Sequence, residues 1–125
     1  MQTTDWIAID RIQILVNSRQ RSDLNYTRES HPQMFQEGVV KFNQTLQVPI
    51  SEDSHLIVVA YGENSDLKTG YGSSWQAEMH PCAYINPIFV DADGGGFTPN
   101  GDTLDLPIPT KGLSVDAAKE MLKRL

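Results

Sequence analysis

The run Leu56-Ile57-Val58-Val59-Ala60 restricts the possible folds of this chain more than any other segment. Three of its apolar residues are β-branched, and no polar residue interrupts it before Tyr61. β-Branched side chains favour strands, and a strand without polar alternation is typical of one buried on both faces. The run is also too short for a buried helix. We therefore expect a central strand over 55–61 that is covered on both faces.

Further strands are predicted by two-residue periodicity or by β-branched composition, in segments 6–17, 24–27, 39–48 and 83–90. In the first segment the alternation breaks at Asp10, where we expect a β-bulge. A turn is expected over 17–20. Asn86-Pro87 interrupts the last segment, and because proline has no backbone N–H this indicates a sheet edge or a bulge.

One short helix is predicted at the C-terminal end, at about 115–125. Ser114 is a favourable N-cap, and Val115, Ala118, Met121 and Leu122 have the spacing of a buried stripe. Basic residues, Arg124 among them, lie near the end of this helix, where the helix dipole is negative. Strands separated by turns, with a single terminal helix, favour an all-β fold, an antiparallel β-sandwich. We expect a sandwich domain over 1–97 and an extension over 98–125.

Composition excludes several classes of partner. The net charge of −6 and a pI near 4.8 disfavour binding to nucleic acid and to anionic membranes. No apolar run reaches the roughly 18 residues of a membrane-spanning helix. The first residues lack the basic and apolar regions of a signal peptide, so the chain is expected in the cytoplasm if Met1 is its genuine start. The single Cys82 excludes an internal disulfide.

The sharpest local motif is Asp91-x-Asp93-Gly94-Gly95-Gly96. Calcium prefers six to eight oxygen ligands, and alternating aspartates in a glycine-rich loop can direct several to one point. Aligned with a twelve-residue calcium loop, Asp91, Asp93 and Asp102 take positions 1, 3 and 12. These three residues are the candidate calcium ligands. The alternative is a turn that ends a strand, with carboxylates accepting backbone N–H groups.

Residues 62–80 lack apolar periodicity, and a loop of that length is frequently functional. Its aromatic residues Tyr71 and Trp75 suit the binding of sugar rings or of a protein partner. The alternative is that both rings fold back over one end of the sandwich.

The three histidines have no metal-ligand spacing. His80 and Cys82 would lie on the same side of an extended segment, so a thiol–imidazole pair is a further hypothesis. The alternative for Cys82 is a small buried apolar residue.

The segment from Ala83 to Asp102, with Asn86-Pro87-Ile88-Phe89-Val90-Asp91 and the acidic glycine loop after it, resembles the C-terminal β-sandwich region of the CehA/McbA family of metallohydrolases. That family belongs to the PHP-type phosphoesterase group. Segments 6–17, 39–42 and 53–60 agree with this likeness, which spans roughly residues 5–105. Gly95 stands where the family's loop often has a further aspartate.

The resemblance implies an immunoglobulin-like module without the catalytic domain, because the family's metal-binding His and Asp motifs do not occur in this sequence. We therefore expect a non-catalytic accessory module, not an enzyme, whose partner is a PHP-type hydrolase catalytic domain. It would have no resident cofactor, calcium excepted. The alternative is an independent module that binds calcium or carbohydrate.

Overall fold

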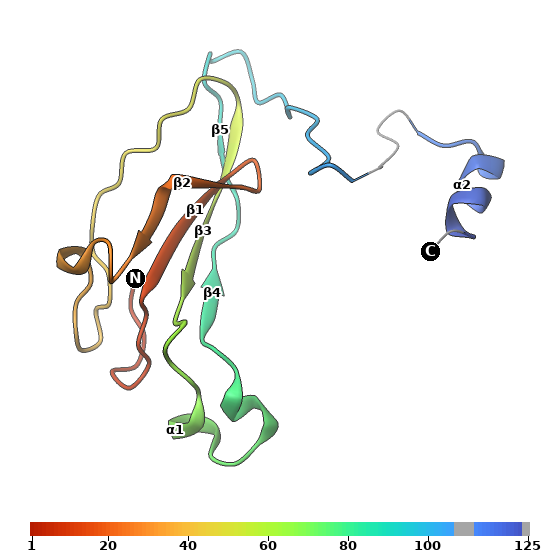
Figure 1. Ribbon diagram of the computed structural model, residues 1–125. Coiled ribbons are helices and arrows are strands. Elements are labelled where there is room, and N and C mark those ends of the chain that lie inside the picture. Colours follow the sequence, from red (N-terminus) through yellow and green to blue (C-terminus); the bar gives the residue numbers. More distant parts are fainter. Residues whose placement is uncertain (107–111, 124–125) are drawn as a thin grey trace.

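The computed structural model describes residues 1–106 and 112–123. Its centre is one antiparallel sheet (Figure 1) of five strands: β1 (Arg11–Val16), β2 (Arg19–Thr27), β3 (Ser54–Tyr61), β4 (Cys82–Tyr84) and β5 (Ile88–Val90). The strand order is β2-β1-β3-β4, and β5 also pairs with β3. The predicted β-rich architecture with a short terminal helix is confirmed. The described residues form a single open sheet and no second sheet.

β3 is the central strand, as the apolar run predicts. It pairs with β1 along one side, and with β4 and β5 along the other. Only Ser54 and Ala60 of this strand are buried, and its other residues are half-buried. The expectation that both faces would be fully covered is therefore wrong for the chain by itself.

The hairpin between β1 and β2 is tighter than the sequence indicates. Its turn is the dipeptide Asn17-Ser18, with φ angles of 52° and 62°, as two-residue hairpin turns of the twisted type require. β2 consequently begins at Arg19 and is far longer than the expected strand over 24–27. The register shift lies between Gln13 and Leu15, not at Asp10.

Asp10 has a different role, which explains why it breaks the alternation. Its carboxylate accepts hydrogen bonds from the backbone N–H groups of Glu63 and Asn64, at 2.8 and 2.9 Å. Asp10 therefore fixes the chain where it leaves β3, just ahead of β1.

β4 and β5 form one interrupted edge strand. In β4, Tyr84 pairs with Val59, and in β5, Ile88 pairs with Leu56. Four steps along the edge strand therefore correspond to three steps along β3. One extra residue is therefore inserted at Asn86-Pro87, and the predicted interruption is confirmed as both a sheet edge and a bulge.

The predicted strand over 39–48 does not form. Residues 32–48, called the strap below, cross one face of the sheet and begin with the 3-10 helix η1 (Pro32–Met34). Only isolated bridges form here, between Gln2 and Val40 and between Phe35 and Phe42. Phe42 enters the core beside Ile9, Ile12, Phe35 and Ala60. The predicted alternation is not kept, because the neighbouring Lys41 is also buried and its Nζ donates to the Asp5 carbonyl at 2.9 Å.

Three short helical elements complete the described chain. The loop over 62–80 contains the helix α1 (Lys68–Tyr71) and the 3-10 helix η2 (Trp75–Glu78). The predicted C-terminal helix is α2 (Val115–Leu122), and the Ser114 side chain accepts the Ala117 N–H as expected. Arg124 lies outside the described residues. None of the described helices has the length and hydropathy to cross a membrane.

Candidate functional site

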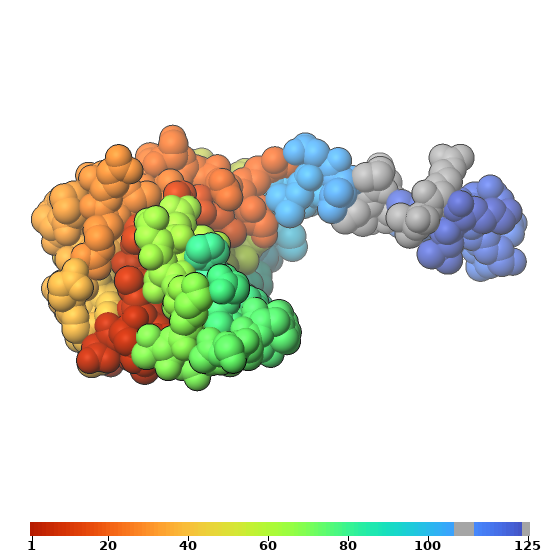
Figure 2. Space-filling view, turned by 60° about the horizontal axis from the view of Figure 1, so that its bottom comes forward, coloured from red at the N-terminus to blue at the C-terminus, as the bar shows by residue number. Residues whose placement is uncertain are grey.

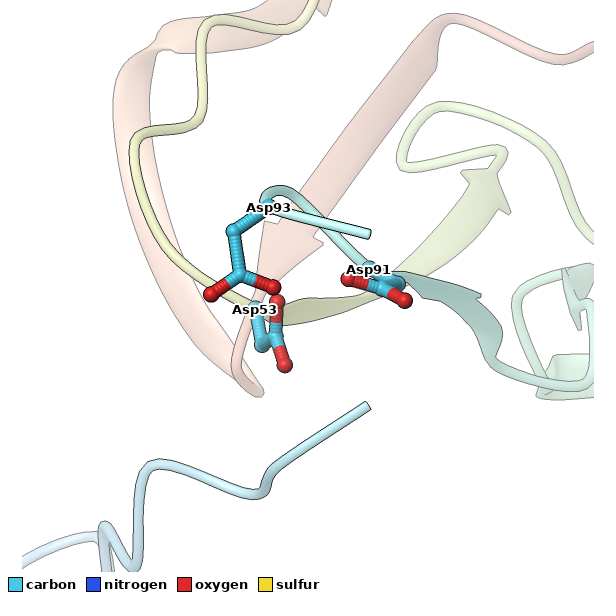
Figure 3. A group of neighbouring side chains, drawn as sticks. All are labelled: Asp53, Asp91 and Asp93. Atoms are coloured by element: carbon cyan, nitrogen blue, oxygen red, sulfur yellow. The ribbon is translucent and has the colours of Figure 1, made fainter. Parts of the chain in front are cut away.

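Three aspartates converge where β5 ends and β3 begins (Figure 3). Carboxylate oxygens of Asp53, Asp91 and Asp93 lie within 4.8 Å of one another. Asp53 precedes β3 directly, and Asp91 follows β5. The pairing of Ser54 with Val90 places these two aspartates side by side. The site therefore joins two strand ends that are distant in the sequence.

Each of these carboxylates already accepts backbone hydrogen bonds. Asp91 accepts from Gly94 and Gly96 at 2.7 and 2.8 Å, and Asp53 accepts from Ala92 and Thr98 at 2.8 and 2.6 Å. The hydrogen bond from the Gly96 N–H is the main cause that lowers the pKa of Asp91 below its usual value. The Asp91 carboxylate is therefore anionic at neutral pH, and the backbone hydrogen bonds that it accepts close the loop around it.

The third predicted ligand, Asp102, lies elsewhere. Its carboxylate forms an ion pair with the guanidinium of Arg19, which also contacts Asp105 at 3.0 Å. The contact with Arg19 lowers the pKa of Asp102 to about 2. Asp53 stands in the acidic cluster where the sequence reasoning placed Asp102. Finding Asp53 from sequence would have required the pairing of β3 with β5.

The two predicted binding aromatics lie in the short helices of the 62–80 loop. Trp75 is 75 % exposed and Tyr71 is also exposed, so neither ring covers the end of the sheet. The ring of Trp6 lies against α1, since a Cβ atom on Gly70 would stand 2.9 Å from it. Binding of carbohydrate at Tyr71 and Trp75 stays a prediction.

His80 and Cys82 are not joined by a hydrogen bond in the described part of the chain. The Nδ1 atom of His80 is bonded to the Ser65 carbonyl at 2.9 Å, so this nitrogen donates. Its ring lies 5.9 Å from that of Tyr61. Cys82 is exposed, which contradicts the interpretation as a buried apolar residue.

The two faces of the sheet differ in their cover. Side chains alternate along a strand, and directly paired residues share a face. The covered face, beneath the strap, carries Ile12, Ile14, Leu56, Val58 and Ala60. The open face carries the apolar Leu15, Ile57, Val59, Tyr84 and Phe89, with Gln13 and His55 beside them. No described helix packs extensively on either face.

The strap does not fill the covered face. An apolar groove of about 500 Å³ remains between strap and sheet. Its lining includes Ile14, Val58, Leu46 and, at the sheet edge, Ile85 and Ile88. No charged side chain is among the residues that line this groove.

The two edges of the sheet also differ. The β2 edge carries Arg21 and Asp23, which pair at 2.6 Å; charges on an edge strand discourage pairing with other chains. The edge formed by residues 82–90 carries no charged residue, and Tyr84 there is 78 % exposed. Apolar surface is therefore concentrated at the β4/β5 side of the molecule.

Comparison with protein-family models, with curated proteins and with solved structures gave no match for this chain.

Proposed function

We propose that this chain is a non-catalytic accessory module that binds a protein partner through the open face of its sheet. The observation that carries the proposal is the composition of β3. Its apolar residues point to both faces, as in a strand buried on both sides. None of the residues 56–59 is fully buried, and Ile57 and Val59 on the open face have no strap over them.

The exposed residues around that strand extend the same surface. Tyr84 pairs with Val59, and Phe89 pairs with His55, so both side chains belong to the open face. Both are exposed. Contiguous exposed apolar surface on a soluble domain is typical of a protein interface, and aromatic residues contribute most at such interfaces.

The partner we propose is a PHP-type hydrolase catalytic domain, as the resemblance of residues 83–102 implies. A domain packed on the open face would cover the apolar side chains that the single sheet leaves accessible there. The role of the chain is then structural: it covers the catalytic domain or shapes the approach of substrate to it.

Binding of such a catalytic domain to the purified chain and to two variants tests the proposal. Tyr84→Lys places a charge on the open face at an exposed position, so folding is retained while binding falls at least about tenfold. Gln33→Lys, on the exposed η1, is the control and leaves binding unchanged. Equal binding by both variants would remove the open face from the interface. Phosphoester hydrolysis by the chain alone with Mn²⁺ or Zn²⁺ would refute the non-catalytic role.

The second candidate function is calcium binding, favoured by the three converging carboxylates. Asp53, Asp91 and Asp93 would each provide one oxygen, and no lysine or arginine within the described ranges forms an ion pair with them. Thermal unfolding with calcium and with chelator tests it. A ligand at about 100 times its dissociation constant stabilises the native state by about 2.7 kcal/mol. A shift that Asp93→Asn abolishes and Asp23→Asn retains supports the site, and no shift leaves these residues as loop-closing groups.

A further inference from the structure

Helix α2 has an apolar side that nothing in the described chain covers. Val115 and Leu122, 71 % and 70 % exposed, lie on the same side of the helix, since seven residues make almost two turns. An isolated helix shorter than about 12–15 residues is only marginally stable in water. α2 has eight residues, so it needs a surface to pack on.

The apolar groove of the covered face offers a surface of matching chemistry and size. Its lining has no charged side chain, and the Met1 ammonium beside it is already bonded to the Phe42 carbonyl at 2.6 Å. This lining suits the uncharged stripe of α2 formed by Val115, Ala118 and Leu122. The eight-residue helix is about 12 Å long, and β3, along which the groove runs, is about 26 Å long. At the β4/β5 edge, Ile85 and Ile88 leave the groove accessible, being 41 % and 50 % exposed.

Residues 98–114, called the tether below, connect the body of the molecule to α2. Arg19 binds Asp102 and Asp105, which fixes the tether at the turn of the β1–β2 hairpin. Figures 1 and 2 show α2 at the opposite end of the molecule from the strap. Eight residues lie between Leu106 and Val115, and the nine steps from one Cα atom to the next extend at most about 30 Å. That reach allows α2 to leave the body of its own molecule and enter a neighbouring one.

We propose that two copies of this chain associate by exchanging α2, each helix lying with its apolar stripe in the apolar groove of the other copy. Reciprocal exchange gives a closed, two-fold symmetric pair in which both helices and both grooves are covered. Pairing of the two β4/β5 edges is the weaker way to associate, because the bulge at Asn86-Pro87 interrupts the ladder. The exchange uses the groove of the covered face, which Tyr84 also borders, so Ile88→Gln and Leu122→Gln test the exchange separately from the partner proposed for the open face.

Sedimentation equilibrium of the full chain, with one variant on each side of α2, tests the association. Leu122→Gln removes an exposed apolar group and is expected to weaken dimerisation by at least about tenfold. Glu120→Gln, on the polar side of the helix, is the matched control and leaves it unchanged. Ile88→Gln in the groove is expected to reproduce the effect of Leu122→Gln. A wild-type chain that stays monomeric, or equal dimerisation by all three variants, would overturn the proposal.

Disulfide trapping distinguishes exchange from docking within one chain. In a Cys82→Ser background, one chain carries Leu122→Cys and a second chain carries Ile85→Cys. Exchange predicts a covalent dimer of the two different chains on mild oxidation. A chain that carries both cysteines and yields only an internally cross-linked monomer would show that the helix occupies its own groove, and would overturn the exchange.

Discussion

The central strand β3 contributes apolar side chains to both faces of the sheet, but the rest of the chain covers only one of these faces. On the covered face, the strap and the N-terminal segment add Phe42, Phe35 and Ile9 to the side chains of β1 and β3. On the open face, Leu15, Ile57 and Val59 have no such layer and stay half-buried. Stability of the isolated chain therefore depends on the covered face, while apolar surface remains both on the open face and in the groove beside the strap.

The largest expected effect distinguishes the two faces directly. Phe42 is 6 % exposed and meets Phe35 edge to face, at 5.3 Å between ring centroids. Because Phe42→Ala removes a buried ring from the core, we expect a loss of about 3–5 kcal/mol in the free energy of unfolding. Val59→Ala, on the open face, should cost about 1 kcal/mol, since its side chain is half in water already. Urea titrations of both variants measure the difference, and similar losses would mean that the open face is packed as tightly as the covered one.

A smaller effect is expected where the layer over the covered face is joined to the end of β3. Gly62 is buried and donates its N–H to the Pro81 carbonyl at 2.9 Å. A Cβ atom at this position would overlap the Ala8 carbonyl oxygen and stand 2.7 Å from the Pro81 ring. Gly62→Ala should therefore lower the free energy of unfolding by about 1–3 kcal/mol, the usual cost of overpacking.

Thermal unfolding of Gly62→Ala measures this cost, with Thr69→Ala on the exposed α1 as the control. An unchanged melting temperature would show that the N-terminal segment around Ala8 moves aside without cost. Its packing would then contribute little to the stability of the covered face.

The strand positions were predictable from sequence wherever local pattern determines them. The run 55–61 identified the central strand, and Asn86-Pro87 identified the bulged edge, because branched side chains and proline act on their own backbone. The strap was not predictable in the same way. Within residues 39–48, only Phe42 of the apolar residues is fully buried, together with Lys41, and whether such a segment forms a strand depends on a neighbouring strand that the sequence does not identify.

The same limit applies to the candidate site. Asp91 and Asp93 are two positions apart in the motif and stand together in the structure. Asp53 lies beside them only because β3 pairs with β5 in one particular register. Asp102 fits the spacing of a calcium loop, but in the structure its carboxylate forms an ion pair with Arg19 on the hairpin. The spacing of residues along a motif does not show which distant side chains of opposite charge will pair with them.

The smallest expected effect concerns the charged periphery, where the contact of Arg19 with Asp102 holds the tether to the hairpin. That contact lowers the pKa of Asp102 to about 2, against about 3.9 in an unfolded chain. A lowered carboxyl pKa means that the folded state binds the proton less readily. The contact therefore contributes fully to stability above about pH 4, and this contribution is lost as the pH falls toward about 2.

Because both groups are exposed, release of the tether should leave the covered face folded. NMR titration would then show hairpin and tether resonances moving with the Asp102 carboxyl while those of Phe42 stay fixed, and Asp102→Asn would produce the released spectrum at neutral pH. Loss of the core signals over that same interval would instead make the ion pair part of what stabilises the sheet.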